Sequence, residues 1–234
     1  HAASTACERD QHAGASGSYP IRSLYFDTDK LDLYWANERE QVDRFKVRVR
    51  TYPGAVDRAW LEVKRRVNDV IVKTRASVSL DTWVDRVRFP TPAGLAEWSP
   101  RLRPYAERFI RLVHSHDLKP VVLVEYWREA YFSTVDDYAR VTFDRRITSQ
   151  RQDQWQLAAE PTAWRPVDYA AKTWTWQPMC VLELKFGVTA PRWMVAMVQS
   201  LDLFRYSFSK YCYSLETQHV LPRANVAGIE AACV

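Results

Sequence analysis

Charged and apolar side chains alternate along several short segments of this chain. In residues 45–50 the order Phe-Lys-Val-Arg-Val-Arg puts Lys46, Arg48 and Arg50 at every second position. Because successive side chains of a β-strand point to opposite faces, this alternation predicts a strand with one charged face and one apolar face. The same alternation returns as late as residues 182–186. Parallel strands are usually apolar on both faces, so the pattern favours an antiparallel sheet.

Predicted strands and helices follow one another along the rest of the sequence. Strands are predicted at residues 21–26, 45–50, 60–65, 70–75, 121–130, 139–146 and 180–186. Helices are predicted at residues 29–37, 79–89, 93–116 and 191–203, and residues 208–211 suit either a closing strand or the start of a last helix. Pro53-Gly54 and Asn68-Asp69 separate the second, third and fourth strands, which predicts an antiparallel meander. A loop rich in Trp, Gln and Pro is predicted at residues 148–176.

The charged strand faces are mostly positive. Ten cations are expected on them: Lys46, Arg48, Arg50, Lys64, Lys73, Arg75, Arg128, Arg140, Lys185 and Lys210. Against Glu62, Asp144 and Glu183 this is a balance of +7, in a chain whose total is +5. The predicted helices need an apolar surface to pack on, so the charged faces are expected to turn away from them and to line a cavity if the sheet curves closed.

This crowding of positive charge has two explanations. Like charges gathered in an interior are costly unless something compensates them, which indicates that a polyanion binds there. For any single strand, an ordinary solvent-facing side of an antiparallel sheet is the simpler alternative.

Composition narrows the class of protein. The chain has 234 residues, of which 47% are hydrophobic, so it can bury a sizeable core and is neither collagen-like nor of low complexity. No apolar run approaches the roughly 18 residues that a membrane span needs. The four cysteines form no Cys-x-x-Cys pair, which indicates reduced thiols, and we expect a cytoplasmic location. Trp155, Trp164, Trp174 and Trp176 lie outside the charged strands, which argues against a nucleic-acid groove.

Eight segments of the chain together resemble one known family. They are residues 21–28, 46–50, 61–64, 73–75, 126–128, 140–144, 182–186 and 208–211, with the sequences IRSLYFDT, KVRVR, LEVK, KTR, YWR, RVTFD, LELKF and FSKY. In this order they resemble the VTC domain, the catalytic domain of the vacuolar transporter chaperone polyphosphate polymerases, which is part of the triphosphate tunnel metalloenzyme (CYTH-like) superfamily. The resemblance implies an α+β fold, an antiparallel β-barrel that forms a tunnel with a basic interior and helices packed outside.

The resemblance also divides the chain. Residues 1–18 are expected to be a flexible lead or the remnant of an upstream segment, residues 19–216 the tunnel domain, and residues 217–234 a C-terminal tail. Superfamily members begin with a strand that carries acidic and basic tunnel residues, often Glu-x-Glu-x-Lys, and residues 1–18 contain nothing similar. We expect either that this strand lies upstream of His1 or that the tunnel is incomplete.

The resemblance implies roles for the charged residues. Phosphate binding is implied for Lys46, Arg48, Arg50, Lys64, Lys73, Arg75, Arg128, Arg140, Lys185 and Lys210. Among them, Lys64, Lys185 and Lys210 are the candidate catalytic residues. Glu183 matches the family glutamate that holds a divalent metal, Mn²⁺ or Mg²⁺. Glu62 stands in a comparable Glu-x-Lys context and is either a second metal ligand or a partner for a tunnel arginine, and Asp144 is expected only as a salt-bridge partner.

The activity that the resemblance implies is polyphosphate polymerisation, in which ATP passes its terminal phosphoryl group to a growing polyphosphate chain inside the tunnel. Phosphoryl transfer needs alignment and charge neutralisation rather than a protein nucleophile, so the lack of a Gly-rich phosphate loop is no objection. A tunnel triphosphatase and a non-catalytic module that binds polyphosphate or nucleotide are the alternatives. The expected partners are ATP, pyrophosphate and polyphosphate, and nucleic acid is not expected. A membrane-associated partner is compatible with the resemblance.

Overall fold

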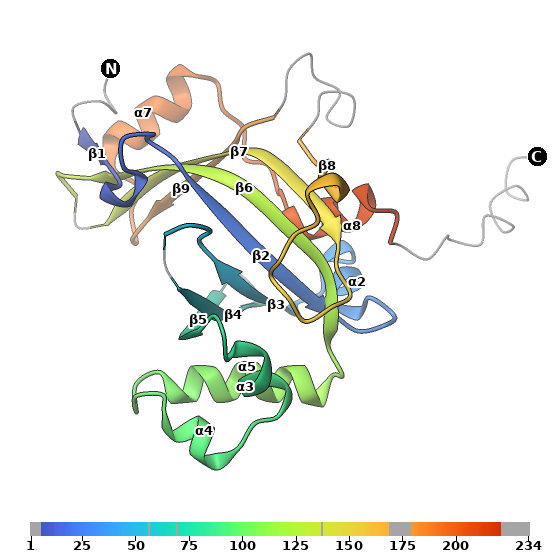
Figure 1. Ribbon diagram of the computed structural model, residues 1–234. Coiled ribbons are helices and arrows are strands. Elements are labelled where there is room, and N and C mark those ends of the chain that lie inside the picture. Colours follow the sequence, from blue (N-terminus) through green and yellow to red (C-terminus); the bar gives the residue numbers. More distant parts are fainter. Residues whose placement is uncertain (1–5, 56, 69, 137, 169–178, 221–234) are drawn as a thin grey trace, which may run out of the picture.

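The computed structural model describes residues 6–55, 57–68, 70–136, 138–168 and 179–220. Residues 169–176 of the predicted loop and residues 221–234 of the predicted tail lie outside this range. The described residues form an α+β fold in which helices flank a curved antiparallel sheet (Figure 1).

Nine strands make up the sheet in the described part of the chain. They are β1 (Cys7–Arg9), β2 (Tyr19–Asp27), β3 (Asp43–Thr51), β4 (Arg58–Val67), β5 (Val70–Ser79), β6 (Lys119–Ser133), β7 (Ala139–Arg151), β8 (Arg165–Pro166) and β9 (Val181–Phe186). Their order is β5-β4-β3-β2-β6-β7-β8, while β1 pairs with β6 and β9 pairs with β7. All the pairings are antiparallel, which confirms the predicted sheet. Most predicted strands are longer than expected, because their hydrogen bonding continues past the alternating residues.

The path of the sheet is open within the described residues. Its ends are β5 on one side and β8 with β9 on the other, and no pairing joins β5 to β9 there. The predicted closure into a barrel is therefore not confirmed. β5 and β9 instead border one pocket, into which they project Lys73 and Lys185. Like charges on two strands oppose their direct pairing, which is a physical reason for the space between them.

Six α-helices and two short 3₁₀ helices are seen in the same residues. They are α2 (Asp32–Glu38), α3 (Trp83–Arg88), α4 (Pro92–Ala96), α5 (Arg103–Ser115), α7 (Arg192–Ser200), α8 (Lys210–Thr217), η1 (Gln11–Ala13) and η2 (Pro161–Ala163). None of the helices in the described range is both long and apolar enough to cross a membrane. The segment at residues 208–211 proves to be the start of a helix, α8, and residues 7–9 of the expected flexible lead form β1.

The predicted helix at residues 93–116 is in fact two helices, α4 and α5. Thr91 starts α4, because its side-chain oxygen accepts a hydrogen bond from the backbone N–H of Gly94 at 3.0 Å. Pro100 disfavours helical backbone at Ser99 and so separates the two helices. The predicted helix at residues 79–89 is also shorter, because β5 continues up to the start of this region.

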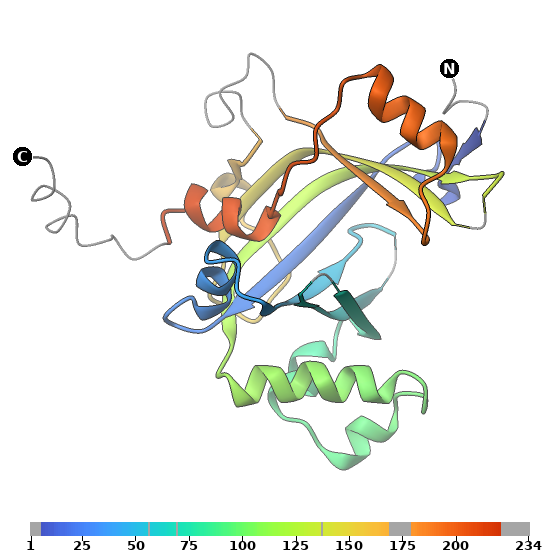
Figure 2. The ribbon, with the colours of Figure 1, turned by 180° about the vertical axis from the view of Figure 1, so that it is seen from behind.

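Four of the described helices cover the outer face of the sheet. α3, α4 and α5 lie below β3, β4 and β5 in Figure 1, where Trp83 and Phe109 pack on the apolar alternates of the strands, such as Val47 and Leu61. α7 packs on the outer face of β7 and β9 through Met194. α2 and α8 lie beside each other at the end of β2 (Figure 2). The expectation of helices outside the sheet holds for α3, α4, α5 and α7. α8 instead packs on the inner face, where the Tyr211 ring stacks on the Tyr25 ring with centroids 5.2 Å apart.

Candidate functional site

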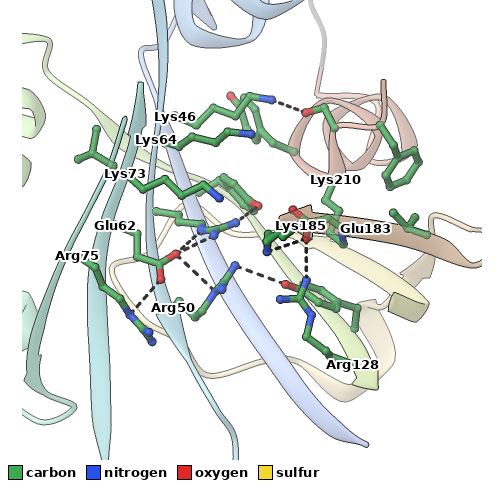
Figure 3. A pocket seen from close by; sticks show the side chains of 18 of the residues that line it. Lys46, Arg50, Glu62, Lys64, Lys73, Arg75, Arg128, Glu183, Lys185 and Lys210 are labelled. Carbon is green, nitrogen blue, oxygen red and sulfur yellow. Dashed lines mark hydrogen bonds and ion pairs between the residues drawn. The ribbon is translucent and has the colours of Figure 1, made fainter. Parts of the chain in front are cut away.

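A pocket of about 440 Å³ lies on the inner side of the curved sheet. β3, β4 and β5 form one wall, and β6, β9 and the first turn of α8 form the other (Figure 3). Nine cationic side chains line the pocket: Lys46, Arg48, Arg50, Lys64, Lys73, Arg75, Arg128, Lys185 and Lys210. Glu62 and Glu183 are its carboxylates. The charged faces of these separate strands thus meet in one pocket.

Three lysines form a row across one wall, which we call the lysine row. Lys46 of β3 is directly opposite Lys64 of β4, which in turn is directly opposite Lys73 of β5. All three extend into the pocket in Figure 3. The Lys46 ammonium donates to Ser209 Oγ at 2.7 Å, and the ion pairs seen in the pocket involve other cations. Like charges directly opposite one another destabilise a sheet, so the lysine row is unfavourable without an anion.

A second row, of arginines, surrounds Glu62. Arg48 Nε donates to Glu62 Oε2 at 2.8 Å, and Arg75 Nε lies 3.2 Å from Oε1. Arg50 Nε lies 3.6 Å from Glu62 Oε2, and Arg48 also donates to the Tyr25 hydroxyl at 2.9 Å. Burial opposes ionisation, yet the three guanidinium groups lower the pKa of Glu62 to about 2. Glu62 is therefore a fixed counter-ion that holds three arginines in place.

The opposite wall is organised by Asp144, which is fully buried. Arg128 donates to both Asp144 oxygens at 2.7 and 2.8 Å, and Lys210 Nζ lies 2.7 Å from Oδ2. Although burial opposes it, Arg128 and Lys210 hold the pKa of Asp144 below its ordinary value. Glu183 Oε2 lies 3.1 Å from Lys185 Nζ and 3.6 Å from Arg128 Nη2. The salt-bridge role expected for Asp144 is thus what the structure shows.

The pocket keeps a large excess of positive charge. Nine cations against these three carboxylates leave a net charge of +6. Lys64 is an exposed residue, yet desolvation and the neighbouring Lys46 and Lys73 lower its pKa to about 8. Burial lowers the pKa of Lys185 to about 8 as well, against the opposing effect of Glu183. Such a cluster creates a positive potential that attracts polyanions.

Arg140 is the predicted phosphate ligand that the structure leaves outside this pocket. Its Nη2 lies 3.4 Å from the Tyr19 hydroxyl and 3.8 Å from Asp10 Oδ2. The guanidinium group lies over the Phe132 ring, 4.6 Å from its centroid. Alternation assigned Arg140 to the correct face of β7, but it does not reveal how far along the strand the pocket extends.

The two candidate metal ligands differ in how well they suit a divalent cation. The Glu183 side chain is 42% exposed, and its carboxylate borders the pocket. Mg²⁺ is commonly held by one or two carboxylates together with phosphate oxygens of the substrate, and Glu183 fits such a site. Both oxygens of Glu62 are held by guanidinium groups, so Glu62 does not fit. Within the described residues, no group of three or more His, Cys, Asp or Glu side chains could hold a metal by itself.

Aromatic and hydroxyl side chains also line the pocket, although the charge pattern of the sequence does not predict them as site residues. They are Tyr25, Tyr126, Tyr206, Phe208, Ser209 and Tyr211. The Tyr126 hydroxyl accepts from Arg50 Nη2 at 3.4 Å, and Lys210 Nζ lies 4.7 Å from the Tyr126 ring centroid. Tyr25 alternates with Ser23 in a predicted strand, so assigning a polar face to that strand would have found it. Tyr206 lies in an irregular segment and carries no periodic signal.

A known protein family matches nearly the whole chain. The family model of the VTC domain matches residues 2–219. Vacuolar transporter chaperone complex subunit 4 of Trypanosoma brucei brucei is 24% identical, in an alignment that covers 85% of this chain and 28% of that protein. The chain therefore spans less than a third of the length of this curated relative.

Solved structures also align with the chain, two of them with the following low TM-scores. One is a Bacillus halodurans protein provisionally assigned as an adenylate cyclase, with a TM-score of 0.46, 13% identity and coverage of 85% of this chain and 83% of that chain. The other is a Pyrococcus horikoshii protein, with a TM-score of 0.35, 11% identity and coverage of 84% and 74%.

Proposed function

Because the chain belongs to the VTC domain family, we propose that it is a polyphosphate polymerase, which transfers the terminal phosphoryl group of ATP to the end of a polyphosphate chain. Family membership supports the polyphosphate-related part of this proposal. The charge of the pocket supports a linear polyanion as its ligand.

The lysine row is the observation that carries the proposal. Its three ammonium groups stand side by side on adjacent strands, and the carboxylates of the pocket pair with other cations. A phosphate chain laid along the row would give each ammonium a charge-assisted hydrogen bond. It would also relieve the repulsion between them, so the pocket is better suited to several linked phosphates than to a single one.

The other cations have distinct roles in this proposal. Phosphoryl transfer depends mainly on aligned phosphates and on neutralisation of the charge that they carry. Arg48 and Arg50 are fixed by Glu62 and by tyrosine hydroxyls, so they would present their remaining N–H groups in set positions. Lys64, Lys185 and Lys210 are the proposed catalytic residues, which stabilise negative charge on the transferred group and on the leaving phosphate.

Glu183 is the residue that would hold a metal. A bound Mn²⁺ or Mg²⁺ would neutralise negative charge on the phosphate groups. Metal binding needs an ionised carboxylate, and the surroundings favour that form. Although burial opposes it, Lys185 and Arg128 lower the pKa of Glu183.

Two alternatives use the same pocket. A tunnel triphosphatase would hydrolyse the bound phosphates, and a binding module would hold them unchanged. We also propose a cytoplasmic location and a membrane-associated partner; a relative named as a subunit of a complex supports a partner of some kind.

Product analysis with ATP, Mn²⁺ and a pyrophosphate primer tests the proposal. A polymerase forms ADP and long-chain polyphosphate, a triphosphatase forms free phosphate, and a binding module leaves ATP unchanged. Glu183→Gln should lower metal-dependent turnover at least tenfold and keep most nucleotide binding, because it removes a metal ligand but leaves the cations in place.

Glu129→Gln is the matched control, because Glu129 lies on β6 and contacts Arg9 and Arg145 outside the pocket. This variant should keep wild-type turnover. Unchanged ATP in the wild-type reaction with Mn²⁺ or Mg²⁺ would refute the polymerase and favour the binding module. Equal turnover of Glu183→Gln and wild type would refute the metal role of Glu183.

A further inference from the structure

Aromatic side chains gather at one end of the pocket, on the segment at residues 201–209 that connects α7 to α8. The Phe208 ring stacks on the Tyr213 ring, with centroids 4.6 Å apart and planes 23° apart. The Tyr206 and Tyr213 hydroxyls lie 3.0 Å from each other. Tyr206 is 74% exposed, yet it lines the pocket together with Phe208. Because it is so exposed, packing in the core does not explain a large aromatic ring at this position.

These rings lie at one end of the lysine row. Ser209 follows Phe208 in the chain, and its Oγ accepts a hydrogen bond from Lys46 Nζ at 2.7 Å. The same Oγ accepts from the backbone N–H of Cys212 at 3.2 Å, which fixes Ser209 at the start of α8. A phosphate chain along the lysine row would therefore end beside Phe208 and Tyr206.

Two further aromatic rings, those of Trp60 and Tyr52, lie beside Arg75. The Arg75 guanidinium lies over the Trp60 ring, 4.5 Å from its centroid. Tyr52 meets the same Trp60 edge-on, with centroids 5.0 Å apart. Neither ring lines the pocket. Tyr206, by contrast, carries an exposed ring that does line the pocket.

We propose that Tyr206 and Phe208 form a stacking platform for the base of a nucleoside triphosphate whose phosphates lie along the lysine row. This inference rests on the proposed function and adds the nucleoside half of the substrate to it. Stacking uses the π-face that every base has, so the platform accepts all the common bases. It holds purines more tightly than pyrimidines, because a purine covers more of the rings.

Calorimetric titration with ATP, with CTP and with inorganic tripolyphosphate tests the platform, in buffer without divalent metal so that no turnover occurs. Tyr206→Ala should weaken ATP binding by about 5- to 20-fold. Its affinity for tripolyphosphate should stay within about twofold of wild type, because the cations are untouched. The preference of the wild type for ATP over CTP should shrink in the same variant, and Tyr206→Phe, which keeps the ring, should bind ATP like wild type.

Phe204→Ala is the matched control. Phe204 is 84% exposed in the same segment and does not line the pocket. Its replacement by Ala should therefore change neither the affinity for ATP nor the affinity for tripolyphosphate. The platform is refuted, while the phosphate site stands, if Tyr206→Ala binds ATP with wild-type affinity. The same conclusion follows if its affinities for ATP and for tripolyphosphate fall equally. If the wild type binds neither ATP nor tripolyphosphate, the phosphate site and the platform are both refuted.

Discussion

Lys64 and Lys185 differ from ordinary surface lysines, because desolvation brings the pKa of each to about 8. Below this pH both are ammonium groups, and above it the folded protein releases protons that an unfolded chain would keep up to about pH 10. An anion binds the ammonium form and not the neutral amine. The anion affinity of the pocket should therefore fall as pH rises through about 8.

A pH series with tripolyphosphate measures this effect. Binding to the wild type should weaken about tenfold or more between about pH 7 and pH 9.5, because each deprotonated lysine loses a charged hydrogen bond. Replacement of Lys64 and Lys185 together by Arg should flatten the profile, because a guanidinium stays charged over this range. Lys119→Arg, at a surface ion pair with Asp29, is the control and should keep the wild-type slope. A wild-type profile that is flat at constant ionic strength would contradict the lowered pKa values.

For single residues, the sequence predicted which charged side chains line the pocket better than it predicted the partner of each. Alternation placed Glu62 on the charged face, and either a metal or an arginine could have been its partner. Three guanidinium groups converge on it only because β3, β4 and β5 pair in this register. A single sequence does not contain that information directly, because register depends on turn geometry and on the packing of the opposite face.

At the scale of elements, one buried carboxylate joins β2, α2 and α8. Asp27 is the last residue of β2. Its two carboxylate oxygens accept hydrogen bonds from the backbone N–H groups of Leu33 and Tyr34, each at 2.9 Å. The hydroxyl of Tyr211, in the first turn of α8, donates to the same carboxylate. Lys210 is the neighbour of Tyr211, so this contact helps to hold Lys210 against Asp144.

Tyr211→Phe should therefore affect both the fold and the pocket. We expect the free energy of unfolding to fall by about 1–2 kcal/mol, because a buried hydrogen bond to a carboxylate is lost. Tripolyphosphate binding should weaken several-fold as Lys210 moves. Chemical denaturation and calorimetry measure the two effects. The control is Tyr105→Phe on α5, which is 40% exposed and should change stability by less than about 0.5 kcal/mol. An unfolding free energy like that of wild type would show that the Asp27 contact is not what holds α8.

Helices and strands could be predicted from the sequence where a single periodicity of apolar residues runs through the whole segment. The strands at residues 45–50 and 60–65 follow from alternation alone, although hydrogen bonding extends each of them. The division between α4 and α5 was missed, since the apolar spacing of residues 93–116 continues through Ser99-Pro100 although the backbone does not. Closure of the sheet was expected from resemblance, and strand alternation carries no information about it.

At the scale of the whole molecule, ligand binding should stabilise the fold. The chain carries +5 overall and the pocket +6, so the remainder is close to neutral and the repulsion is concentrated in one place. Tripolyphosphate at about 100 times its dissociation constant should add about 2.7 kcal/mol to the free energy of unfolding. For a chain of this size, that raises Tm by about 5–10 °C.

Thermal unfolding with and without tripolyphosphate checks this expectation. Sodium chloride at matched ionic strength is the first control and should give a much smaller shift. Replacement of Lys46, Lys64 and Lys73 together by Met is the second; this variant should melt at or above the wild-type temperature without ligand and gain little from tripolyphosphate. If sodium chloride matched the effect of tripolyphosphate, general screening rather than a bound chain of phosphates would explain it.

The lysine row also constrains how such a protein can evolve. Its three ammonium groups repel one another in the empty pocket, so a neutral side chain of similar length at any of these positions would make the ligand-free fold more robust. Selection for robustness and selection for phosphate handling therefore act in opposite directions on the same three residues. When phosphate occupies the pocket, the three lysines stabilise the fold; when the pocket is empty, they destabilise it. The fraction of time for which phosphate is bound therefore decides which kind of selection prevails.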